Sequence, residues 1–172
     1  MRLIIETGTG FPDANSYIGI TDVNLFLPSA VLEKWNDLSE DEKIDRLLIA
    51  SLFIDSSFNW KGIQKKLEQG MNWPRTDVYF QGHKLPDDYI PNRLKKAVGM
   101  ALNLIMDFGL GVFQQIGDVQ VKREKLGQLE TEYFESLKTN AENGTAYGDI
   151  NNILRGLYCQ PGSVMTAEVI RK

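Results

Sequence analysis

Two stretches of the chain repeat apolar residues at the spacing of an α-helix. The first follows Ser39 and Glu42, whose three-residue spacing is that of a capping box, and it predicts a helix that runs to about Ser56. The second begins at Pro91, ends at Gly109, and has the broadest apolar stripe: Leu94, Ala97, Val98, Ala101, Leu102, Leu104, Ile105 and Phe108. We expect these two helices to pack against each other as the core.

Weaker patterns predict the remaining elements of the first part of the chain. Short helical segments are expected over residues 23–27, 30–35 and 63–69, and a short strand over residues 3–5. The Gly-rich segment 7–10 reads as a flexible lead-in.

A tryptophan–proline block separates the helical segments. We expect Trp73, Pro74 and Arg75, together with Pro91, to form a structural corner between two helices, because a large ring seeks burial and proline stops a helix. The link between them, residues 76–89, is polar.

The C-terminal part of the chain changes to alternating apolar and polar residues. This alternation predicts a β-hairpin at about 119–134, then a polar loop at 138–148 and a short helix, 150–158, with Asp149 as its N-cap. Residues 159–172 read as an extended arm that could add a strand to a neighbouring molecule. The residues expected at partner interfaces are Val121, Arg123, Lys125, Tyr133, Val164, Met165, Val169 and Ile170.

The predicted fold class is therefore mainly α: a small helical bundle with an extended β-hairpin and an extended C-terminal arm. Residues 1–158 would form one helical domain that includes the hairpin. A length of 172 residues with 42% apolar composition is sufficient for one core.

Charge is unevenly distributed along the chain. The net charge is −4, but residues 1–58 carry 4 basic and 10 acidic side chains, whereas residues 59–96 carry 8 basic and 4 acidic ones. Only this middle block could contact nucleic acid, and only weakly. With a single cysteine and no long apolar segment, the sequence indicates a soluble protein of a reducing compartment.

No residue pattern indicates catalysis. His83 and Cys159 are the only histidine and cysteine, so no metal-ligand spacing or nucleophile–base pair is present. The segment Thr7-Gly8-Thr9-Gly10 lacks the Gly-Lys-Ser/Thr ending of a phosphate loop. We therefore predict no catalytic, cofactor-binding or metal-binding residues, no cofactor, and no enzyme activity.

One segment interleaves aromatic rings with cations and has two interpretations. Its candidate nucleic-acid residues are Trp60, Lys61, Lys65, Lys66 and Arg75, beside Phe58, Trp73, Tyr79 and Phe80. They could form a stacking platform for single-stranded DNA. The favoured alternative places the tryptophans in the core and the lysines on a solvated helix face, because a ring that sets a corner is not free to stack on bases.

Six ordered segments resemble a family of tailed-phage proteins. They are Glu6…Gly8…Pro12-Asp13-Ala14-Asn15-Ser16-Tyr17, Ala50…Ile54-Asp55, Gln69…Trp73-Pro74-Arg75, Ile90-Pro91, Val121-Lys122-Arg123-Glu124-Lys125-Leu126-Gly127…Glu132-Tyr133, and Ile153-Leu154. Members are often labelled "putative DnaT-like single-stranded DNA-binding protein" and are similar to head–tail connector, or adaptor, proteins.

The resemblance implies a structural virion protein at the neck, made in the host cytoplasm. Such a subunit would form a dodecameric ring with copies of itself beneath the portal protein, and it would also contact a downstream tail or neck protein. Genomic double-stranded DNA would pass through the ring without specific binding. The alternative function is a single-stranded DNA-binding module.

Overall fold

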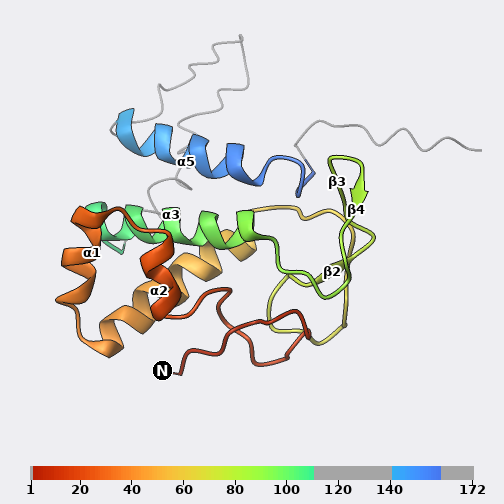
Figure 1. Cartoon of the computed structure of the whole chain (residues 1–172), viewed down its shortest axis with the longest axis horizontal. Helices are drawn as coiled ribbons and strands as arrows, with labels where there is room; N and C mark the ends of the chain where they lie inside the picture. Colours follow the sequence, from red (N-terminus) through yellow and green to blue (C-terminus); the bar gives the residue numbers. More distant parts are fainter. Residues whose placement is uncertain (1, 111–140, 160–172) are drawn as a thin grey trace, which may run out of the picture.

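The computed structural model describes residues 2–110 and 141–159. Within these ranges the chain forms one 3₁₀-helix, four α-helices and four two-residue strands (Figure 1). The helices are η1 (Thr21–Leu25), α1 (Ser29–Asn36), α2 (Glu40–Ser56), α3 (Asn92–Phe108) and α5 (Ala141–Leu154). The strands are β1 (Ile63–Gln64), β2 (Arg75–Thr76), β3 (Tyr79–Phe80) and β4 (His83–Lys84).

The capping box predicted at the start of α2 is present. The Ser39 side chain accepts a hydrogen bond from the Glu42 N–H, and the Glu42 carboxylate accepts one from the Ser39 N–H. The Ser39 hydroxyl also donates to the Glu42 carboxylate at 2.8 Å, and this bond, followed by the one from the Ser39 N–H, lowers the pKa of Glu42. The prediction of this helix is confirmed, and Leu52 on its surface is 65% exposed.

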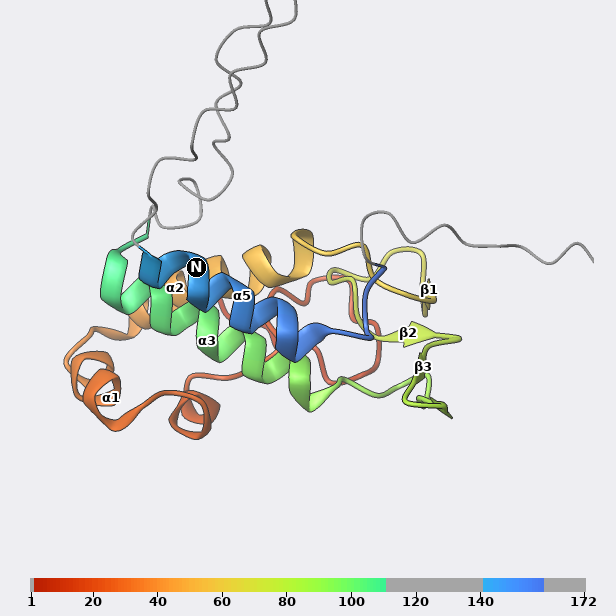
Figure 2. The same ribbon diagram turned by 90° about the horizontal axis from the view of Figure 1, so that it is seen from above.

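The long helix after Pro91 is confirmed as α3. All residues of its predicted stripe are buried except Phe108, and Gly109 ends the helix at a φ of 87°. Helix α3 packs against α2 on one side and α5 on another, so its stripe forms the centre of the core (Figures 1 and 2).

Helix α5 begins earlier than the sequence predicted. The predictions of an N-cap at Asp149 and of a loop over residues 141–148 are wrong, because Ala141–Leu154 is helical. The residues that follow turn back to the segment after α2: the Lys61 N–H bonds to the Leu157 carbonyl at 3.0 Å, and the Cys159 N–H to the Asn59 carbonyl at 2.7 Å. Arg93 of α3 also donates to the Ile153 carbonyl. Tertiary packing therefore decides where α5 lies.

The helical segment predicted over residues 63–69 is wrong. Residues 63–64 form β1, antiparallel to β2, with Ile63 opposite Thr76 and Gln64 opposite Arg75. Gln69 is buried, and its side chain bonds to the Lys66 N–H and to the carbonyls of Met71 and Pro74. These local bonds satisfy backbone groups without a helix.

The polar link 76–89 contains a small hairpin that the sequence pattern does not predict. β3 pairs antiparallel with β4 through Gln81 and Gly82, which both have positive φ. This is the backbone shape of a tight hairpin turn, but Gln-Gly is a weaker signal for it than Asn-Gly or Asp-Gly. The long connection between α2 and α3 contains both sheets. The Trp73–Arg75 corner lies within this connection rather than directly between two helices.

The N-terminal segment is an ordered loop and not the predicted flexible lead-in. No strand forms over residues 3–5; Ile5 makes only an isolated bridge with Ser16. The buried Glu6 carboxylate accepts hydrogen bonds from the N–H groups of Gly8, Gly10 and Phe11 at 2.8–3.0 Å.

The fold is thus mixed rather than clearly mainly α. A three-helix core with α1 and η1 at one end is joined to two small antiparallel sheets at the other (Figure 2). The predicted hairpin at 119–134 and the arm beyond residue 159 lie outside the described residues. No helix in the described ranges combines the length and the apolar character needed to cross a bilayer.

Candidate functional site

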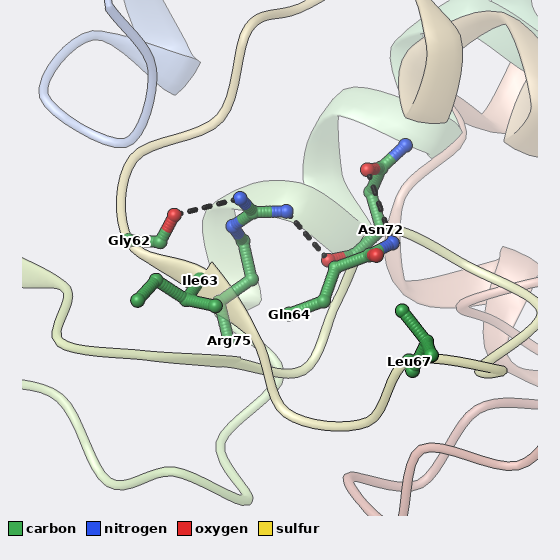
Figure 3. Close-up of a pocket in the computed structure, with 6 residues that line it drawn as sticks. All are labelled: Gly62, Ile63, Gln64, Leu67, Asn72 and Arg75. Atoms are coloured by element: carbon green, nitrogen blue, oxygen red, sulfur yellow. Dashed lines mark hydrogen bonds between the residues drawn. The ribbon is translucent and has the colours of Figure 1, made fainter.

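An open groove with mixed chemistry lies on the β1–β2 pair. It has a volume of about 530 Å³ and is lined by Gly62, Ile63, Gln64, Leu67, Asn72 and Arg75 (Figure 3). Ile63 and Leu67 are 65% and 94% exposed, so apolar side chains border the groove. The other lining side chains are two amides and a guanidinium.

Arg75 holds the two sides of this groove together. Its Nε donates to the Lys61 carbonyl at 2.7 Å, Nη1 to the Asn72 carbonyl at 3.2 Å, and Nη2 to the Gly62 carbonyl at 2.8 Å (Figure 3). Partial burial lowers the pKa of Arg75, but a guanidinium stays charged in proteins. Arg75 is therefore a positioning cation whose donors are largely in use.

Asp55 holds Asn72 in place through hydrogen bonds to its backbone and its side chain. The Asn72 Nδ2 donates to the Asp55 Oδ2 and to the Asp55 carbonyl, both at 3.1 Å, and the Asn72 N–H donates to the Asp55 Oδ1 at 2.8 Å. The Asn72 Oδ1 is then left facing Gln64, whose Nε2 lies 3.5 Å away (Figure 3). At this distance the two amides bond weakly and keep capacity for other partners.

Asp55 also connects the groove to the core. The Tyr17 hydroxyl donates to the Asp55 Oδ1 and accepts from the Trp73 N–H at 3.1 Å, and the Trp60 Nε1 donates to the Asp55 carbonyl at 2.9 Å. Burial raises the pKa of Asp55, although bonds from Tyr17 and Asn72 oppose the rise. Burial, reinforced by the nearby Asp55 charge, also raises the pKa of Tyr17.

The lysines expected to contact nucleic acid lie around this groove. Lys61 and Lys66 flank β1, and Lys65 donates from Nζ to the Gly8 carbonyl at 3.0 Å. Within residues 2–110 and 141–159, neither these lysines nor Arg75 forms an ion pair with a carboxylate. They do not lie on a helix face, contrary to the interpretation favoured from the sequence.

The tryptophans are not available as a stacking platform. Trp60 is 5% exposed and Trp73 is fully buried, with their rings edge to face at a centroid distance of 6.0 Å. Phe58 is buried too, against Trp60 and Tyr158. Of the rings in that segment only Tyr79, 59% exposed in β3, could stack on a base. Trp60 is therefore a core residue.

The segment 7–10 cannot serve as a phosphate loop in this conformation. The backbone N–H groups of Gly8, Gly10 and Phe11 already bind the carboxylate of Glu6. A phosphate would have to displace this buried anion.

A second cleft of about 600 Å³ lies between the N-terminal loop and the start of α3. Its ionisable side chains include Asp22, Asp88 and Lys95, so its charge is mixed. His83 is exposed in β4 and Cys159 is half-buried beyond α5. Among the described residues, no group of three or more His, Cys, Asp or Glu side chains could hold a metal ion.

The partner-interface residues lie outside the described residues. This holds for all eight: Val121, Arg123, Lys125, Tyr133, Val164, Met165, Val169 and Ile170. In the corner, by contrast, Trp73, Pro74 and Pro91 are buried and Arg75 is half-buried.

Three of the segments on which the family resemblance rests meet in the hydrogen-bond network that holds Asn72, a lining residue of this groove. Tyr17, Asp55 and Asn72-Trp73 come from separate parts of the chain and share one hydrogen-bond network. A family model matches residues 1–172. The chain belongs to the family described as "Putative DnaT-like ssDNA binding protein". Comparison with curated proteins and with solved structures finds no match.

In this DnaT-like chain the sequence pattern identifies the cations at the groove but not the apolar and amide side chains that line it. Ile63, Gln64 and Leu67 do not stand out in the sequence, because the pattern predicts a helix over residues 63–69. Asp55 and Asn72 stood in the segments of the family resemblance, but their contact spans 17 residues and only the folded chain reveals it.

Proposed function

We propose that the protein binds single-stranded DNA on the surface around β1 and β2. The observation that carries the proposal is the set of Lys61, Lys65, Lys66 and Arg75 beside an open groove, with no carboxylate in ion-pair contact with them in the described ranges. Unneutralised cations attract phosphates. Membership of a family with this description supports the same ligand.

The expected mode of binding differs from a tryptophan platform. Lys61 and Lys66 would contact the DNA backbone, while Lys65 and Arg75 keep the loops in place through their carbonyl bonds. Since phosphates carry the contact, binding should weaken steeply with salt. No chemical step is proposed; the role is binding and not catalysis.

The test compares two variants of equal net charge. Lys61→Gln with Lys66→Gln should weaken binding of a labelled oligothymidine and reduce the magnitude of the slope of log K against log salt by about 1.4, because each lost phosphate contact contributes about 0.7. The control, Lys34→Gln with Lys43→Gln, removes two cations from α1 and α2.

The control variant should bind like the wild type. Equal loss in both variants would show that only net charge matters, and absence of binding by the wild type at low salt would refute the proposal.

A structural assembly role is a second proposal, and a different observation favours it. Leu25 and Leu52 are 78% and 65% exposed in the acidic segment 1–58, whereas Leu67 is exposed in the basic segment 59–96. A head-to-tail contact would bury apolar groups between opposite charges, and repetition of that contact could close a ring. The portal protein, a tail component and a place in the virion neck belong to this second proposal.

Self-association can be measured without those partners. The assembly role predicts that the average molecular mass in solution rises with protein concentration and falls at high salt. Light scattering measures this mass. A constant monomer mass at all concentrations would contradict self-association.

A further inference from the structure

We propose that the groove on β1 and β2 accepts one unpaired nucleobase and thereby makes the protein prefer single strands to duplexes. This inference rests on the proposed DNA-binding function. It concerns the groove lined by Ile63, Gln64, Leu67 and Asn72, whereas the lysines around it contact phosphates whether or not a base is present.

The groove is unsuited to a phosphate. Its only lining cation, Arg75, uses three of its N–H groups on the carbonyls of Lys61, Gly62 and Asn72. A guanidinium that gives three of its five N–H groups to backbone carbonyls is a weaker ligand for phosphate than a free arginine side chain. The remaining lining side chains are uncharged.

Two lining groups match the flat faces of a base. Ile63 and Leu67 are large apolar side chains left 65% and 94% exposed. Contact with a planar ring would remove apolar area from water on both partners. The volume of about 530 Å³ lies within the range of small-molecule sites.

Two other lining groups match the polar edge of a base. Asp55 binds the Asn72 Nδ2 and so directs the Asn72 Oδ1 toward Gln64. Among the residues that the structure describes, the Gln64 amide is restrained only by that 3.5 Å contact, so both amides can exchange it for bonds to a base. Gln64 can offer a donor and an acceptor to the edge of a base, whereas Asn72, whose Nδ2 is held by Asp55, offers the acceptor Oδ1.

This geometry selects an unpaired base. In a duplex the Watson–Crick edge is already paired and the ring faces are stacked, so neither is available to the groove. In a single strand both are free. The flanking lysines would hold the phosphates on either side.

The experiment measures binding of the full chain to three labelled probes of equal length at low salt: an oligothymidine, a strand of abasic sites and a duplex. We expect the abasic strand to bind at least about fivefold more weakly than the oligothymidine, because it lacks the ring that would cover the apolar side chains of Ile63 and Leu67. The duplex should also bind more weakly than the oligothymidine.

Variants locate the effect. Leu67→Ser should weaken oligothymidine binding about fivefold, because it removes apolar area that the base would cover, and it should leave abasic binding unchanged. Leu52→Ser, an exposed leucine of α2 outside the groove, is the matched control and should bind both probes like the wild type. Gln64→Ala should reproduce the direction of the Leu67 effect.

The outcomes separate the two proposals. Equal affinity for oligothymidine and abasic strand, or equal effects of Leu67→Ser and Leu52→Ser, would overturn the base site while DNA binding still stood. No binding of any probe would refute DNA binding itself, and with it the base site.

Discussion

At the scale of single residues, Asp55 links the core to the surface. Its carboxylate receives bonds from the Tyr17 hydroxyl and from the backbone and side chain of Asn72. Its carbonyl receives the Trp60 indole N–H. One side chain thus orients a buried tyrosine, a groove amide and, through Tyr17, the backbone of Trp73. A buried carboxylate is retained here because nearly every lone pair has a donor.

The pH dependence of stability should reveal this carboxylate. Because burial raises the pKa of Asp55 above its unfolded value of about 3.9, the folded state binds a proton more tightly than the unfolded state. The resulting stabilisation is full below the unfolded pKa and is lost as pH rises through the folded pKa. Relative to Asp55→Asn, which cannot titrate, the wild type should lose free energy of unfolding over that interval.

Urea unfolding at a series of pH values from about 4 upward measures the difference. Asp55→Asn should also cost about 1–3 kcal/mol overall, because its NH2 group replaces a carboxylate oxygen that accepts a hydrogen bond from Asn72. Asp45→Asn, on an exposed position of the same helix, is the control. An unchanged pH slope in Asp55→Asn would disprove this account of the carboxylate.

At the scale of elements, the backbone of α3 passes very close to the segment that follows η1. A Cβ built on Gly99 would lie 2.3 Å from the Cβ of Phe26, so only glycine permits this approach. Phe26 in turn packs against the core. The packing of one element therefore depends on a missing side chain in another.

The same substitution should have opposite effects in two helices. Gly99→Ala should lower the free energy of unfolding by about 1–3 kcal/mol, because the new methyl group overpacks the contact with Phe26. Gly148→Ala in α5, where a Cβ meets nothing within 4 Å, should raise it by up to about 1 kcal/mol through helix propensity. Urea unfolding of both variants provides the measurement. Stabilisation by both substitutions would contradict the close approach.

At the scale of the whole molecule, the two sheets and the helical core are joined by contacts distant in sequence. Residues 59–61 bond to residues 157–159, and the N-terminal loop bonds to the groove loop through Lys65 and through Gly70, whose N–H donates to the Phe11 carbonyl. The buried apolar residues form one continuous cluster that contains Trp35, Trp60 and Trp73. The chain should therefore unfold as one cooperative unit.

Two probes that report on different parts test this prediction. Far-ultraviolet circular dichroism follows the helices, and tryptophan fluorescence includes Trp60 and Trp73 beside the sheets. The two urea transitions should coincide. A fluorescence change that precedes the loss of helix would indicate that the sheet region unfolds separately.

The sequence alone determined the elements whose signals are local. The capping box of α2 and the stripe and terminators of α3 each lie within one helix, so short-range physics suffices to predict them. The cations of the candidate site were also readable, since their charge needs no partner.

Tertiary structure decided what depends on distant contacts. β1 exists because residues 75–76 pair with it, and α5 takes its bounds while packed on α3. The burial of Trp60, which the sequence favoured over a stacking role, is likewise decided by the fold. The groove amide of Asn72 is oriented by Asp55, from the preceding helix. Such features arise when segments far apart in the chain compete for burial and hydrogen bonds, and that competition has no signature in a local pattern.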